Sequence, residues 1–127
     1  MIIASREGHL DVVDRLVDAG TDVDTARTDT GTTPLFIAAQ KGHLDVVGRL
    51  IDARADVNTA RTDSGVTPLF LSAQNGHLDV VERLIAAGAD VDQARWDGTT
   101  PLTIAHACGH ADVAQKLRAA GATEPHG

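Results

Sequence analysis

The chain has 127 residues, of which 43% are hydrophobic and 23% are charged, a composition typical of one compact soluble domain and too apolar for a disordered chain. Eighteen acidic against eleven basic side chains give a net charge of -7, which argues against binding to nucleic-acid phosphates, and the apolar runs are too short to cross a membrane. The first residues lack the pattern of a secretory signal and the single Cys108 excludes an intramolecular disulfide, so we expect a cytoplasmic protein.

Two short motifs recur along the chain at nearly constant spacing. Gly-His begins at residues 8, 42, 76 and 109, and Thr-Pro-Leu begins at residues 33, 67 and 100. A period of 33 or 34 residues is typical of a tandem array of small supersecondary units. We therefore predict that the whole chain forms one repeat array.

Local signals within each copy predict a pair of helices. Thr33 is a good helix N-cap, Pro34 suits the first helical position, and Gly42 ends this first helix. A second helix is expected from about Leu44, and the turn-forming residues 55–65 then lead into the next Thr-Pro-Leu. Because helices this short are unstable alone in water, each pair should pack against the next in an all-α solenoid.

Three motifs of the third copy carry a family resemblance: residues 65–69 are Gly-Val-Thr-Pro-Leu, residues 76–81 are Gly-His-Leu-Asp-Val-Val, and residues 88–91 are Gly-Ala-Asp-Val. They resemble the ankyrin repeat, and the resemblance covers essentially the whole chain. It implies stacked helix-turn-helix repeats joined by β-hairpin-like loops. It further implies binding to a protein through the hairpin tips and a concave groove lined by the first helices, with no catalysis and no cofactor. The single domain, 1–127, is then divided into a partial first repeat (1–30), two full repeats (31–64 and 65–97) and a C-terminal capping repeat (98–127).

Some residues depart from the repeat pattern. Arg54 stands where Gly20 and Gly88 supply a left-handed helix end, and Gly48 interrupts the second helix of the same copy. We therefore predict that residues 49–55 form the softest internal segment. The first two inter-repeat loops also carry one residue more than the third, so their hairpin geometry is expected to differ.

The two ends of the array are predicted to differ. Ile2, Ile3 and Leu10 open the first copy without a polar capping repeat, so we expect a fragment of a longer array or self-association through this end. In the last copy, Ala111 replaces a leucine and a polar tail runs over residues 123–127, which predicts a C-terminal cap.

Histidine and aspartate clusters have structural interpretations. The Gly-His rings lie a full repeat apart, too far to share one zinc ion, and we expect them to pack and hydrogen-bond at the turns. His106, Cys108 and His110 are close in sequence, but residues two apart on a helix point to different sides, so no metal site is predicted. The aspartate clusters lack calcium-loop spacing and are expected to cap turns, while pairs such as Asp45 and Arg49 should bridge one exposed helix face.

Partner contacts are predicted at the hairpin tips and along the first helices. Arg27, Arg61 and Arg95 recur once per loop, where they either hold one loop on the next or contact a partner. Trp96 either anchors a partner or packs on the neighbouring hairpin. The full candidate set is Arg27, Asp29, Thr32, Phe36, Gln40, Lys41, Arg61, Asp63, Ser64, Val66, Phe70, Gln74, Asn75, Arg95, Trp96, Asp97 and Thr99.

Within this set, Phe36 and Phe70 are interpreted either as packing between repeats or as an apolar patch in the groove. The acidic balance predicts a protein partner with a basic surface, and neither nucleic acid nor a membrane. The alternative hypothesis is a structural or engineered repeat scaffold that has no partner of its own.

Overall fold

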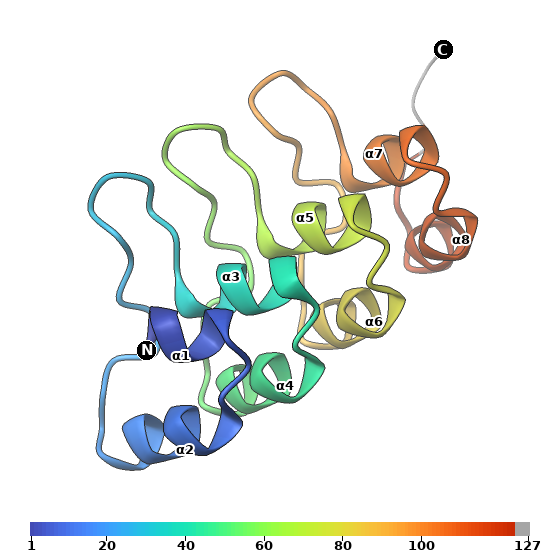
Figure 1. Ribbon diagram of the computed structural model, residues 1–127. Helices are drawn as coiled ribbons and strands as arrows, with labels where there is room; N and C mark the ends of the chain where they lie inside the picture. Colours follow the sequence, from blue (N-terminus) through green and yellow to red (C-terminus); the bar gives the residue numbers. More distant parts are fainter. Residues whose placement is uncertain (124–127) are drawn as a thin grey trace.

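A computed structural model describes residues 1–123, which form helices joined by short turns and long loops (Figure 1). The first helices of the four repeats are α1 (Ile2–Arg6), α3 (Pro34–Lys41), α5 (Pro68–Gln74) and α7 (Pro101–Ala107). The second helices are α2 (Leu10–Asp18), α4 (Leu44–Asp52), α6 (Leu78–Ala86) and α8 (Ala111–Ala119). Apart from Thr123, the predicted polar tail lies outside the described residues.

The helix pairs stack side by side in two rows, with α1, α3, α5 and α7 in one row and α2, α4, α6 and α8 in the other (Figure 1). Three long loops project from the row of first helices, on the side away from the second helices (Figure 1). The stacked all-helical solenoid predicted from the sequence is therefore confirmed. Across residues 1–123 the loops contain no β-strand, although each long loop turns back on itself as a hairpin does.

The first helices begin where the Thr-Pro pairs predict. Thr33 accepts a hydrogen bond from the main-chain N–H of Phe36, and Thr67 and Thr100 cap α5 and α7 in the same way. A proline follows each of these threonines, at a position where a helix does not need an N–H donor. The caps thus fix where each hairpin ends and where its helix starts.

Small side chains allow the first helices to pack closely on one another. Ala38, Ala39, Ala73 and Ala105 are fully buried, because each lies between neighbouring helices of the stack. The second helices contribute fully buried valines and leucines, of which Leu50 is an example. These residues belong to a single core that extends through all the repeats, so each helix pair depends on its neighbours for burial.

The recurring histidines join each repeat to the one before it. His43 Nε2 lies 2.9 Å from the carbonyl oxygen of Arg6, and His77 Nε2 lies 3.2 Å from that of Gln40. A carbonyl oxygen only accepts, so Nε2 is the donor in each case. The His77 ring also lies directly over Gly42, where an added Cβ would come within 2.8 Å of it. The predicted structural role of these rings is therefore observed.

Basic residues on the second helices also contact the preceding repeat, which corrects the prediction of pairs along one helix face. Arg49 Nε lies 2.7 Å from Asp14 Oδ1, and Arg49 Nη2 lies 3.1 Å from Asp18 Oδ1. Asp45, the predicted partner, instead accepts the N–H of Val46. The arginine turns toward α2 because it forms two ion pairs there, whereas its own helix offers only the single carboxylate of Asp45.

Aspartate and asparagine side chains cap the turns that follow the second helices. Asp22 Oδ1 accepts the N–H of Asp24, as the prediction of turn capping requires. Asp24 Oδ1 in turn accepts the N–H of Asp56 in the next repeat, at 3.0 Å. The capping residues therefore also connect consecutive repeats.

Arg54 has a φ of 69°, and it is the one non-glycine residue with positive φ among residues 1–123. The left-handed conformation predicted for this position is confirmed. Such a conformation is unfavourable for a residue that carries a Cβ. The softness of residues 49–55 that we infer from it remains a prediction.

Candidate partner-binding surface

Each hairpin tip carries an arginine paired with the aspartate two residues later. The N–O distances are 3.2 Å for Arg27–Asp29, 2.6 Å for Arg61–Asp63 and 2.8 Å for Arg95–Asp97. Hydrogen bonding to the guanidinium is the main reason why the pKa values of Asp29, Asp63 and Asp97 lie below their usual range. In the third tip Thr99 adds a further support, since its N–H donates to Asp97 Oδ1. The charged groups at the tips are thus held in fixed positions.

The tip arginines also cover the phenylalanines of the first helices. The Arg61 guanidinium lies 5.7 Å from the centroid of the Phe36 ring, and the Arg95 guanidinium lies 5.0 Å from that of Phe70. These are cation–π distances. Arg61 and Arg95 therefore each contact an aspartate of their own hairpin and a phenylalanine of the first helix in their own repeat. These contacts differ from the predicted role, in which the arginines hold one loop on the next.

Main-chain hydrogen bonds hold the hairpins on one another instead. The Thr62 N–H donates to the carbonyl oxygen of Thr30 at 2.9 Å, and the Trp96 N–H donates to that of Ser64 at the same distance. Both bonds join equivalent positions of consecutive loops. The longer first and second loops accommodate their extra residue without losing this register.

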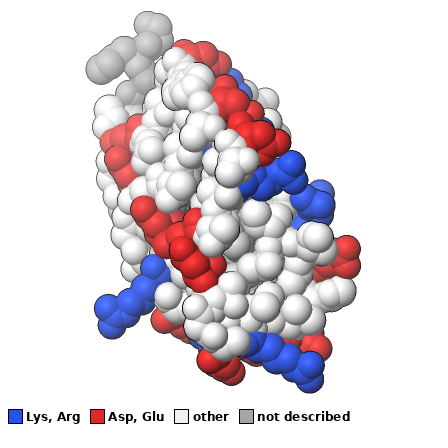
Figure 2. All heavy atoms as spheres, turned by 90° about the vertical axis from the view of Figure 1, so that its left-hand side faces the viewer, with Lys and Arg blue, Asp and Glu red and all other residues white. Residues whose placement is uncertain are grey.

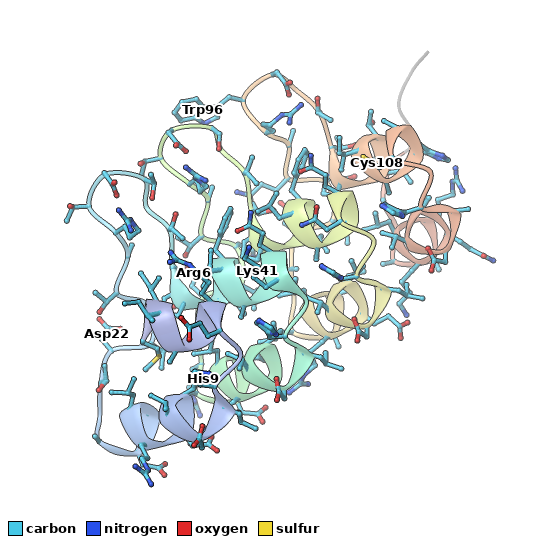
Figure 3. The ribbon with its side chains drawn as sticks, viewed as in Figure 1. Arg6, His9, Asp22, Lys41, Trp96 and Cys108 are labelled. Carbon is cyan, nitrogen blue, oxygen red and sulfur yellow. The ribbon has the colours of Figure 1, made fainter. Side chains whose placement is uncertain are left out.

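Trp96 both packs on its neighbour and remains exposed. A Cβ added to Gly65 would clash with the indole, so the ring lies against the bare main chain of the preceding hairpin. The residue is nevertheless 70% exposed, and it lies at the tip of its loop (Figure 3). Packing on the neighbouring hairpin is therefore observed for one part of the ring, and a role as an anchor for a partner remains a prediction for the exposed part.

Four predicted residues lie at the ends of the first helices. Lys41 is exposed at the end of α3, whereas Gln40 and Gln74 are half-buried and use their carbonyl oxygens to bind histidine rings. Asn75 is exposed, but its Nδ2 donates to the carbonyl oxygen of Gln40 at 3.0 Å. Lys41 is thus the side chain of this group most open to a partner (Figure 3).

Four candidate residues are buried, which corrects the prediction that they contact a partner. Thr32 and Val66 are 7% and 8% exposed, and Phe36 and Phe70 are 2% and 1% exposed. The two rings form a small second core with Val66 under the hairpins, so they pack between repeats and form no open patch. The remaining residues, which we call the hairpin surface, are Arg27, Asp29, Gln40, Lys41, Arg61, Asp63, Ser64, Gln74, Asn75, Arg95, Trp96, Asp97 and Thr99.

The repeat register adds residues that the candidate set omits. Arg6 and Glu7 occupy in the first copy the positions of Gln40 and Lys41, and both are exposed. Cys108, also exposed, occupies the position of Lys41 in the last copy (Figure 3). Extending the alignment of the copies to both ends of the array identifies these residues from sequence alone.

An open hollow of about 730 Å³ lies along the second helices, whereas the hairpin tips project from the row of first helices (Figure 1). It is lined mainly by α6, together with Leu44 and the turn at His77. Glu82 contributes a carboxylate to its wall.

Comparison with known protein families agrees with this architecture. A family model described as ankyrin repeats (3 copies) matches residues 1–95 and, in a second match, residues 49–125. The chain belongs to the ankyrin repeat family. A comparison with curated proteins finds no match.

Ankyrin repeats generally mediate protein–protein interaction, and the family is typically non-enzymatic. In the part of this ankyrin array that the structure describes, no three histidine, cysteine, aspartate or glutamate residues are grouped to hold a metal ion. The histidines of the 106–110 segment are engaged elsewhere: His106 Nε2 contacts Arg118 and His110 Nε2 contacts the carbonyl oxygen of Gln74. None of the described helices is both long and apolar enough to span a bilayer.

Proposed function

We propose that this ankyrin array binds a protein partner on the hairpin surface, with Trp96 as the main anchor. The observation that carries the proposal is the 70% exposure of an indole that Gly65 and a main-chain hydrogen bond already hold in place. Tryptophan is enriched among the residues that dominate binding energies. A side chain fixed before binding loses little conformational entropy when the partner covers it.

The net charge of the whole chain favours a partner with basic side chains, while the hairpin surface itself carries four basic and three acidic side chains. Asp97 follows Trp96 in the sequence, and Asp63 precedes Ser64, whose carbonyl oxygen accepts the Trp96 N–H from the next hairpin. The side chains of Asp63 and Asp97 are 44% and 56% exposed. Acidic side chains recur over the face that Figure 2 shows, with basic side chains between them, and the whole chain carries a net charge of -7. A lysine or arginine of the partner would find both a carboxylate and an aromatic face at this tip. We place this interaction in the cytoplasm, in keeping with the single cysteine.

The test uses two surface variants chosen by position. Trp96→Thr installs the residue that Thr62 provides at the equivalent tip, so the fold should tolerate it. Glu82→Gln changes a side chain in the hollow on the second helices, away from the hairpin tips. Proteins that the unmodified chain retains from a lysate are identified by mass spectrometry, and each is then purified and titrated against the three chains.

A partner that uses the hairpin surface should bind Trp96→Thr about 30-fold more weakly, as loss of an anchor worth about 2 kcal/mol requires. It should bind Glu82→Gln unchanged and should shift the fluorescence of Trp96, the only tryptophan. The opposite pattern, with binding lost in Glu82→Gln alone, would move the site to the second helices. If no protein is retained, the scaffold interpretation replaces the proposal.

A further inference from the structure

The joints between neighbouring second helices differ in the side chains that lie between the helices. At the joint of α2 and α4, Asp14 reaches across to Arg49, whose Nε lies 2.7 Å from the carboxylate. Gly48 takes the position of Asp14 at the joint of α4 and α6, so no side chain extends from it. Arg83 is the equivalent of Arg49, and its Nε lies 3.7 Å from the place that a Cβ on Gly48 would occupy. The space that a carboxylate fills at the first joint is therefore open at the second.

The hollow of about 730 Å³ described above lies at this second joint, and we call it the outer groove. Its two helices, α4 and α6, are neighbours in the row of second helices (Figure 1). A leucine begins each helix: Leu44 is 39% exposed, and Leu78 is half-buried. At the joint of α6 and α8, Ala111 replaces the second of these leucines and leaves a smaller apolar wall. Of the three joints, the outer groove alone combines two leucine walls with a glycine at the position of Asp14.

Acidic side chains line the outer groove beside the leucines. Asp79 and Glu82 are three residues apart on α6, so they lie on the same side of that helix, and both are exposed. Neither forms an ion pair with any of the residues that the structure describes, and Asp79 Oδ1 accepts the N–H of Val80. The positive charge of Arg83 is balanced by Asp52, whose Oδ1 lies 2.8 Å from its Nη2. The groove therefore presents apolar surface together with uncompensated negative charge.

We propose that the outer groove binds an amphipathic helix of a partner protein, with aliphatic side chains and lysine or arginine on the face that enters the groove. An aliphatic side chain of this helix lies between Leu44 and Leu78. A basic residue three or four positions away shares its face of the helix and pairs with Asp79 or Glu82.

Each half of this chemistry has a separate role. Burial of the aliphatic side chain between two leucines supplies affinity, and the carboxylates select a basic helix over an acidic one. The outer groove lies on the second helices, whereas the hairpin tips project from the first helices (Figure 1). The proposal is therefore independent of binding at the hairpin surface.

The test uses two synthetic peptides that form helices. One carries leucines on one face with lysines beside them, and the other has glutamate in place of every lysine. Each peptide carries a fluorescent label and is titrated by fluorescence anisotropy against the unmodified chain and three variants. Circular dichroism first establishes that each variant keeps the helix content of the unmodified chain.

The three variants separate apolar contact from charge. Leu44→Asp removes one wall of the groove and adds a negative charge, at a position in the first turn of α4 where the helix dipole favours an acidic residue. Glu82→Gln removes one carboxylate from the groove. Asp112→Asn is the matched control, because it removes the same charge from the first turn of α8.

The lysine peptide should bind the unmodified chain, and Leu44→Asp should weaken this binding about tenfold although the chain becomes more acidic. Glu82→Gln should weaken it about threefold, as loss of a partly exposed ion pair requires. Asp112→Asn should leave it unchanged.

Tighter binding of the lysine peptide to Leu44→Asp would overturn the proposal, because net charge alone would then explain the attraction. Absence of binding to the unmodified chain, or equal binding of the glutamate peptide, would overturn it as well. Sedimentation tests the remaining occupant. A dimer of the unmodified chain that Leu44→Asp dissociates would contradict the proposal, since a second copy would then fill the groove.

Discussion

Replacing the recurring histidines one at a time should show how much of their contribution to stability comes from contacts between repeats and how much from effects within a repeat. His43, His77 and His110 each donate to a carbonyl oxygen of the preceding repeat, at 2.9, 3.2 and 3.1 Å. His9 occupies the same position in its own repeat and makes no such bond within the described residues. The His9→Ala variant is therefore the internal control for the other three.

The expected cost follows from the structure. Each donated hydrogen bond contributes about 0.5–1.5 kcal/mol, and packing of the ring against a glycine adds about 1 kcal/mol of buried apolar contact. The Gln40 carbonyl also accepts from Asn75, so His77→Ala leaves it partnered. We therefore expect losses of about 2 kcal/mol for His43→Ala and His110→Ala, somewhat less for His77→Ala, and under about 0.5 kcal/mol for His9→Ala.

Urea denaturation followed by far-ultraviolet circular dichroism measures these differences, with the denaturant slope checked for each variant. All four histidines precede a second helix, so an effect on helix initiation alone would be equal at every position. If His9→Ala costs as much as His43→Ala, the histidines act within their repeats and the reasoning from the inter-repeat bonds fails.

Three further predictions concern single positions. Arg54→Gly should raise the free energy of unfolding by roughly 0.5–1 kcal/mol, because relief of the left-handed strain exceeds the added flexibility of the unfolded chain; a loss in urea denaturation would contradict it. Gly48→Ala should also stabilise by roughly 0.5–1 kcal/mol, since the nearest atom to the new Cβ is Arg83 Nε at 3.7 Å; its amide exchange in α4 should slow accordingly. The pKa values of Asp63 and Asp97 are lowered in the folded protein, so their stabilisation is present above about pH 4 and is lost as pH falls through the lowered values. Carboxyl carbon shifts should titrate below the usual aspartate pKa, and midpoints near 3.9 would contradict the pairing.

Most of the fold could be predicted from the sequence because its determinants are local and recur. Thr33 and Pro34 specify where a helix starts, and Gly42 specifies where it ends, without reference to any distant residue. Repetition of these signals at a fixed spacing then requires that the pairs stack. The left-handed Arg54 could be predicted for the same reason, since the other copies show glycine at that position.

The errors and open alternatives concern side chains whose surroundings come from distant parts of the sequence. Arg49 is four residues from Asp45, yet it pairs with Asp14 and Asp18, which adjacent packing of α2 and α4 brings closer. The sequence leaves two interpretations of Phe36 because the residues that surround it, Val66 and Phe70 in the core and Arg61 over the ring, follow much later in the chain. Local periodicity says which face of a helix is apolar, but not which side chain of a later loop covers it.

The stacking positions and the tip positions of this array are constrained differently. Residues that join the repeats, such as His43 and His77, are the same in successive copies because each must meet the same carbonyl oxygen and glycine. Thr62 and Trp96 occupy equivalent tips and differ completely in size, yet both donate the same main-chain bond to the preceding hairpin. The main chain thus holds both tips in the same way, so a change of side chain at a tip should alter the proposed binding surface at little cost to the stack.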